Sequence, residues 1–178
     1  FDARPGGSGR DYRLISSVFF TPSPRDPMPV PPETPSIIAL VVRQNTAGIE
    51  EPVAKVVAFL QEAGHRVVFE ADTAAHLGMP GVETMTVTEI GEQAPLAIVM
   101  GGDGTMLGIA RQLAKYDIAL IGINLGRLGF ITDIPVERML PALGEILQGK
   151  ATTEKRTLLE GRVMRGGEMI FCGVAVND

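Results

Sequence analysis

The sequence has few of the residues on which several classes of protein depend. It contains one Cys, two Tyr and no Trp in 178 residues, and aromatic residues make up 5% of it. A single Cys excludes an internal disulfide framework and a cysteine-based zinc site, and it suits a reducing cytoplasm. A net charge of −5 and the shortage of aromatics argue against a nucleic-acid partner, which needs a basic face. No apolar run approaches the roughly 20 residues of a membrane helix, so no membrane partner is expected.

What the sequence does have is 45% apolar residues and 21 Gly, enough for a packed core with tight turns. Proline divides the chain, because eight of its 13 Pro lie in residues 1–35. Pro lacks a backbone donor and restricts the residue before it. We therefore predict that residues 1–35 are a disordered, Pro-rich extension.

From residue 36 to residue 150, short apolar runs alternate with segments of helical spacing. The runs predict strands at 37–42, 66–70, 96–100 and 118–123. Helical spacing follows the first, third and fourth of these runs, whereas residues 71–92 stay mostly unassigned, with a short strand near 84–88. The alternation predicts an α/β nucleotide-binding domain over 36–150. Its fold class is an open, mostly parallel, doubly wound sheet that binds ligands beyond the carboxyl ends of its strands.

After residue 150 the pattern changes from alternating strands and helices to strands alone. Residues 157–164 and 168–176 have the composition of two strands, and the glycines between them are typical of a hairpin turn. A lone hairpin is marginally stable in water. We therefore predict that 151–178 are the first strands of a truncated β-rich second domain.

The most informative segment is Gly101-Gly102-Asp103-Gly104-Thr105, which directly follows an apolar strand and opens a helix. Glycines there let backbone N–H groups approach an anion, and the helix N-terminus adds partial positive charge. A carboxylate among them would repel a phosphate, so Asp103 makes sense where it accepts a hydroxyl proton or holds a divalent cation. Thr105 is the expected N-cap. The alternative is a tight turn in which Asp103 only caps the helix.

A second turn, from Asn124 to Phe130, leaves the end of the next strand, and we expect both turns at the same edge of the sheet. Asn124 can read polar groups of a ligand, Gly126 and Gly129 leave room for one, and Phe130 offers an apolar wall. This turn therefore predicts the other half of a binding site.

Together these motifs resemble a known family. The first turn is shared by several kinases, including the diacylglycerol and sphingosine kinases. The segment from Ile121 to Asp133 and the ending from Val174 to Asp178, in that order, closely resemble the bacterial NAD kinases. The Pro-x-Gly-Thr-x-Asn-Asp type segment of the lipid kinases is absent from the sequence. The resemblance covers about residues 36–178.

The resemblance implies an enzyme that transfers a phosphoryl group from ATP, or in some members polyphosphate, to the 2′-hydroxyl of NAD's adenosine ribose, giving NADP. It implies that Asp103 is the catalytic proton acceptor and that Mg²⁺ is carried with the nucleotide, so no residue is predicted as a metal ligand. From local chemistry and resemblance together, the candidate residues for binding ATP and NAD are Gly101, Gly102, Gly104, Thr105, Asn124, Phe130, Asn177 and Asp178.

The family's second, β-rich domain is almost wholly missing from the sequence. We therefore expect this chain to be a fragment with little or no kinase activity alone, and the full-length protein to be a cytoplasmic homo-oligomer. Two alternatives are a lipid or sugar kinase that shares the first turn, and a non-catalytic nucleotide-binding remnant. Two other residues are interpreted structurally: His65 as an exposed turn residue, and Cys172 as a small buried hydrophobe.

Overall fold

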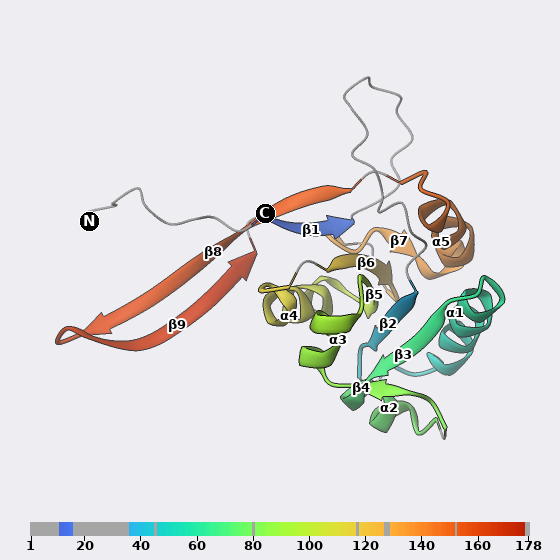
Figure 1. Cartoon of the computed structure of the whole chain (residues 1–178), viewed down its shortest axis with the longest axis horizontal. Coiled ribbons are helices and arrows are strands. Elements are labelled where there is room, and N and C mark those ends of the chain that lie inside the picture. The colour runs from blue at the N-terminus through green and yellow to red at the C-terminus, as the bar shows by residue number, and fades with distance from the viewer. Residues whose placement is uncertain are drawn as a thin grey trace.

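The computed structural model describes residues 11–15, 36–44, 46–79, 81–116, 118–126, 129–151 and 153–176. These residues form a parallel sheet with helices on both faces, and a long antiparallel hairpin that projects from it (Figure 1). The predicted α/β class with a mostly parallel, doubly wound sheet is therefore confirmed. None of the helices in these ranges is long and apolar enough to cross a bilayer.

The sheet is built from strands that run in the order β4-β3-β2-β5-β6-β1-β8-β9, with β7 beside β6. The parallel strands are β1 (Asp11–Ile15), β2 (Ile37–Val42), β3 (Arg66–Glu70), β4 (Thr84–Met85), β5 (Leu96–Gly101), β6 (Ala119–Asn124) and β7 (Ile134–Pro135). All six residues of β5 are buried, as expected for a central strand that is covered on both faces. The four strands predicted between residues 37 and 123 are all present.

The helices are α1 (Glu50–Glu62), α2 (Ala71–Leu77), α3 (Val87–Gln93), α4 (Asp103–Leu113), the short 3₁₀ turn η1 (Val136–Arg138) and α5 (Met139–Leu147). Pro52 lies in the first turn of α1, where a missing N–H costs nothing. Pro141 likewise lies in the first turn of α5, so the helix begins just before it instead of breaking.

Two helices lie in the stretch that sequence patterning left unassigned. Each has seven residues, too few for a clear apolar periodicity, and each begins at a side-chain cap. Glu70 accepts hydrogen bonds from the N–H groups of Asp72 and Thr73 at the start of α2. Thr86 and Glu89 form a reciprocal capping box at the start of α3. Capping, rather than periodicity, therefore specifies these two helices.

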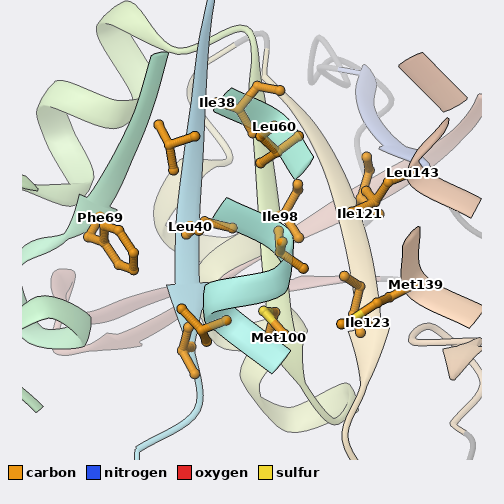
Figure 2. Packing of buried hydrophobic residues seen from close by; sticks show 14 of the residues in the cluster. Ile38, Leu40, Leu60, Phe69, Ile98, Met100, Ile121, Ile123, Met139 and Leu143 are labelled. Atoms are coloured by element: carbon orange, nitrogen blue, oxygen red, sulfur yellow. The ribbon is translucent and has the colours of Figure 1, made fainter. Parts of the chain in front are cut away.

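Alternate side chains of the sheet enter two separate apolar layers, one on each face. One layer joins the sheet to α1 and α5, and the other joins it to α3 and α4. Figure 2 shows the first layer, where Leu143 and Met139 of α5 lie beside Ile121 and Ile123 of β6. Because both faces are packed, the sheet holds the ends of its strands in fixed relative positions.

The expectation of disorder over residues 1–35 is wrong for five of them. The strand β1 pairs in parallel with β6 and antiparallel with β8, so it lies within the sheet. The sequence did not predict this strand, because it lies in a Pro-rich region and its pairing partners are more than 100 residues away in sequence. Residues 1–10 and 16–35 lie outside the described residues.

The hairpin consists of β8 (Glu154–Arg165) and β9 (Glu168–Val176), joined at Gly166 and Gly167. Both glycines have positive φ, +58° and +87°, as this tight turn requires. The hairpin carries apolar side chains that are about half exposed or more: Leu159, Val163, Met164, Met169, Ile170 and Phe171. Since β8 pairs with β1 as well as with β9, the division of the chain near residue 150 stays a prediction.

Two interpretations of single residues are wrong. Cys172 is exposed rather than buried, because the described residues leave both faces of the hairpin tip open. His65 is buried rather than exposed, at 6% exposure. Its N–H donates to the carbonyl of Leu60 at 3.0 Å, which draws the turn between α1 and β3 tightly inward.

Candidate active site

The two glycine-rich turns meet at the carboxyl ends of β5 and β6. These neighbouring parallel strands place Gly101 opposite Asn124 at their ends, and the N–H of Leu125 donates to the carbonyl of Gly101 at 3.3 Å. The prediction that both turns lie at the same edge of the sheet is therefore confirmed. This is the edge at which doubly wound sheets bind ligands.

Helix α4 begins earlier than its sequence predicts. Gly102 is the N-cap, with no side chain to cap the helix, and the N–H groups of Thr105 and Met106 both donate to the Gly102 carbonyl, at 3.0 and 3.1 Å. Thr105 is therefore not the N-cap. Its side chain packs over Gly101 instead, where an added Cβ would lie 2.7 Å from Thr105 Oγ1. Gly101 is thus required by the protein's own packing.

The backbone at Gly102 and Gly104 is open. A Cβ built on either residue meets no protein atom within 4 Å. Both residues lie at the N-terminus of α4, where backbone N–H groups and the helix dipole favour an anion. The first turn therefore presents an open, partly positive backbone surface.

The carboxylate of Asp103, the first residue of α4, is held by the second turn. Its Oδ2 accepts the N–H of Phe130 at 2.9 Å. Its Oδ1 accepts the N–H of Thr132 at 2.9 Å, the Thr132 hydroxyl at 2.8 Å, and the N–H of Ile131 at 3.3 Å. These bonds join the two turns across 27 to 29 residues of sequence, whereas α4 has no side-chain cap, so the alternative in which Asp103 only caps the helix does not describe this contact.

These contacts set the charge of the Asp103 side chain. Partial burial raises the pKa of its carboxyl, but the hydrogen bonds from the Thr132 hydroxyl and from the N–H groups of Thr132, Phe130 and Ile131 together outweigh burial. The pKa of Asp103 therefore lies below its usual value, and the group is ionised at neutral pH.

Gly129 makes the close approach of the two turns sterically feasible. A Cβ at this residue would overlap the carboxylate of Asp103. Its N–H donates to the carbonyl of Thr132 at 3.2 Å, which closes the turn around residues 130 and 131. The room that Gly129 leaves is thus occupied by Asp103 itself and not by open solvent.

Asn124, which we predicted to contact a ligand, is 3% exposed and bonds within the protein. Its Nδ2 donates to the carbonyl of Thr132 at 2.9 Å and to Thr132 Oγ1 at 3.0 Å, while its Oδ1 accepts the N–H of Gly126 at 2.8 Å. Thr132 is fully buried, and our sequence reasoning missed it. The sequence feature that could have indicated Thr132 is a small hydroxyl residue two positions after Phe130, in a glycine-rich turn.

Phe130 is 89% exposed, the most exposed of the large hydrophobic side chains in the described residues. Its backbone N–H bonds to Asp103, so an exposed apolar side chain is attached to the residue that holds the carboxylate. Asn177 and Asp178, the other two candidate residues, lie outside the described residues, as does Arg127. No group of three or more His, Cys, Asp and Glu side chains in the described part of the chain is placed to hold a metal ion.

The arrangement suits proton transfer from a hydroxyl next to a bound anion. A carboxylate oxygen has about two acceptor sites. Among the described residues, Oδ1 of Asp103 accepts three hydrogen bonds, which fill its acceptor sites, whereas Oδ2 accepts one. Oδ2 can therefore accept a hydrogen bond from a substrate hydroxyl, while the open start of α4 favours phosphate.

Comparisons with known proteins agree with this chemistry. Residues 38–151 match the family model described as the ATP-NAD kinase N-terminal domain. The NAD kinases of Burkholderia pseudomallei and Burkholderia thailandensis are 53% and 54% identical to this chain over 141 residues, which are 79% of this chain and 47% of each relative. The chain thus spans about half the length of the curated relatives it matches.

A solved structure shows the same fold. The crystal structure of yeast NADH kinase complexed with NADH aligns with a TM-score of 0.67 and 17% sequence identity. The alignment covers 85% of this chain and 51% of that chain.

Proposed function

This chain belongs to the ATP-NAD kinase family, and we propose that the protein phosphorylates the 2′-hydroxyl of the adenosine ribose of NAD. ATP, bound as its Mg²⁺ complex, is the proposed phosphoryl donor, with polyphosphate as the alternative donor. The product is NADP. In this reaction the ribose 2′-oxygen forms a bond to the γ-phosphorus, and the bond from that phosphorus to the bridging oxygen breaks with its electron pair leaving on ADP.

The observation that carries the proposal is the position of the Asp103 carboxylate. It lies at the start of α4, beside the open backbone of Gly102 and Gly104, and its Oδ2 accepts one hydrogen bond from the described part of the chain. A ribose hydroxyl is a weak acid, so a nearby carboxylate helps by orienting it and taking its proton as the new bond forms. General-base help of this kind is worth on the order of 10²–10⁴ in rate.

The other candidate residues have supporting roles in the proposal. The N-terminal N–H groups of α4 would bind phosphate, and the exposed ring of Phe130 would pack against NAD. Asn177 and Asp178 would contact NAD, as the family resemblance implies. Mg²⁺ would travel on the nucleotide phosphates and reduce the repulsion between those phosphates and Asp103.

The setting of the reaction is also a proposal. We place the full-length protein in the cytoplasm, which suits its single Cys over residues 1–178, and we propose that it forms a homo-oligomer. Because the chain spans about half the length of its relatives, we propose that residues 1–178 alone form little or no NADP.

The proposal is tested by NADP formation from NAD and ATP in the full-length protein. We expect Asp103→Asn to lower kcat by about 10²- to 10⁴-fold, because the amide cannot take the proton. The matched control is Asp72→Asn. Asp72 also lies in the first turn of a helix that follows a parallel strand, but its side chain is exposed. Because a substitution at the surface has little effect, we expect its kcat to stay within about twofold of the original value.

The same experiment includes the binding of NAD and the thermal unfolding of each variant. Intact binding with lost turnover supports a catalytic role for Asp103. Turnover by Asp103→Asn at the rate of the Asp72→Asn control would refute it.

A further inference from the structure

The hydrogen bonds behind Asp103 form a chain with one direction. The N–H of Gly126 donates to Oδ1 of Asn124 at 2.8 Å, which fixes the orientation of the Asn124 amide. The amide Nδ2 therefore points toward Thr132 and donates to its Oγ1 at 3.0 Å and to its carbonyl at 2.9 Å. The Thr132 hydroxyl then donates to Oδ1 of Asp103 at 2.8 Å.

The direction of this chain settles where the Thr132 hydroxyl proton lies. A threonine hydroxyl has one proton to donate and rotates to suit its neighbours. Because Asn124 donates to Thr132 Oγ1, the proton is directed to the remaining partner, the Asp103 carboxylate. Thr132 is 0% exposed and Asn124 is 3% exposed, so water does not compete for either group.

We infer that Thr132 is a positioning residue of the proposed reaction: its hydroxyl, oriented by Asn124, holds Oδ1 of Asp103 so that Oδ2 meets the substrate hydroxyl. This inference rests on the proposed function and names the reacting oxygen of the carboxylate. Without the hydroxyl, Asp103 would keep its backbone donors but lose the side-chain hydrogen bond to Oδ1, which at 2.8 Å is the shortest of these contacts.

The packing around Thr132 offers a clean substitution. Its methyl group fits over Gly122, where an added Cβ would lie 2.8 Å from Thr132 Cγ2. Valine keeps this methyl and replaces only the hydroxyl, whereas serine keeps the hydroxyl and removes the methyl. Thr132→Val and Thr132→Ser therefore separate the hydrogen bond from the packing.

The first readout is kinetic, in the full-length protein with NAD and ATP. We expect Thr132→Val to lower kcat by about 10- to 100-fold, the effect of losing a hydrogen bond to a charged group. The KM for NAD should change by less than about threefold, because a misplaced carboxylate affects the transition state more than substrate binding. Thr132→Ser should restore most of kcat. A kcat for Thr132→Val equal to that of the original protein would overturn the inference.

The second readout does not depend on activity. The Thr132 hydroxyl is the strongest of the contacts that lower the pKa of Asp103, so its removal should raise that pKa. Carbon NMR of Asp carboxyl groups would detect the rise in Thr132→Val and its reversal in Thr132→Ser. An unchanged pKa in Thr132→Val would contradict the inference even if the protein is a kinase.

The two proposals fail in different ways. If Asp103→Asn keeps full turnover, the proposed function fails, whereas the NMR titration still reports whether the Thr132 hydroxyl holds the carboxylate. If Thr132→Val does not fold, Thr132→Ala removes the same hydroxyl without placing a methyl against the carboxylate. The same loss of kcat and rise in pKa are expected of it, and their absence would overturn the inference.

Discussion

The two glycine-rich turns look alike in sequence and differ in what fills the space beside their glycines. In the first turn, the positions beside Gly102 and Gly104 are open. In the second turn, the position beside Gly129 is filled by the carboxylate of Asp103. Glycine therefore leaves open space at two positions of the first turn and makes room for the protein's own packing at Gly129. Each turn has one exception: Thr105 covers Gly101 in the first, and the position beside Gly126 in the second is open.

The two turns therefore have different roles in the proposed site. The first turn presents open backbone, the proposed binding surface, and contributes the carboxylate, whereas the second turn holds that carboxylate with backbone N–H groups and a buried hydroxyl. The predictions below test whether the two kinds of glycine can be told apart by experiment.

The largest effect is expected at Gly129. In Gly129→Ala the new methyl overlaps the Asp103 carboxylate, which must leave its position. We expect the free energy of unfolding to fall by about 1–3 kcal/mol, the usual cost of overpacking, measured by urea denaturation. We expect turnover to fall by at least about 10²-fold, because the proton acceptor is displaced.

Gly126→Ala is the matched control for stability, since a Cβ there meets no protein atom within 4 Å and the N–H that bonds Asn124 is kept. Its free energy of unfolding should change by less than about 0.5 kcal/mol. Equal destabilisation by the two substitutions would contradict the difference between glycines beside occupied space and glycines beside open space.

A smaller effect, of opposite sign for stability and activity, is expected at Gly104. Gly104→Ala meets no protein atom, and alanine favours a helix more than glycine does, so the free energy of unfolding should rise by up to about 1 kcal/mol. If a substrate occupies the open space, kcat/KM should nevertheless fall by about tenfold or more.

Gly108→Ala is its control on the same helix, one turn further along, where an added Cβ is equally unobstructed. It should stabilise the protein by a similar amount, about 0.5–1 kcal/mol, and leave kcat/KM within about twofold. Unchanged kcat/KM in Gly104→Ala would show that no ligand approaches the start of α4.

The smallest effect concerns acid stability. Since the pKa of Asp103 is lowered in the folded protein, its contribution to stability is present above the unfolded value of about 3.9 and is lost as pH falls through the folded value. The free energy of unfolding should therefore decrease more steeply with falling pH below about 4 in the original protein than in Asp103→Asn.

Other carboxyls with a lowered pKa, namely Glu51, Glu83 and Glu89, are present in both proteins, so the difference between the two slopes isolates Asp103. The free energy of unfolding would be measured by chemical denaturation from about pH 2 to about pH 5. If it changes equally with pH in both proteins, the second turn does not stabilise the ionised carboxylate.

The sequence predicted those features that depend on local patterns. Apolar runs located the strands from β2 to β6, except the two-residue strand β4, whose position was only approximate. The strand order at the carboxyl edge followed from the rules for parallel sheets, so the meeting of the two turns was predictable. Asp103 was recognisable because a carboxylate among phosphate-binding glycines needs a chemical reason.

What the sequence did not predict depends on contacts between distant residues. The bonds from Phe130 and Thr132 to Asp103 form only when the second turn folds over the start of α4. In the same folded turn Thr132 is buried and the Asn124 side chain points inward, and neither feature has a periodic signal in the sequence. The strand β1 was missed for the same reason, because its partners lie more than 100 residues further along the chain.

The central claim is that Oδ2 of Asp103 faces the ribose hydroxyl that receives phosphate. The most direct measurement is the distance between that oxygen and the 2′-oxygen of the adenosine ribose in a crystal structure of the full-length protein with NAD. The account predicts a hydrogen bond of about 2.6–3.2 Å, with Oδ1 still bonded to Thr132. A ribose bound out of reach of Asp103, or a carboxylate that meets the hydroxyl through Oδ1, would contradict it.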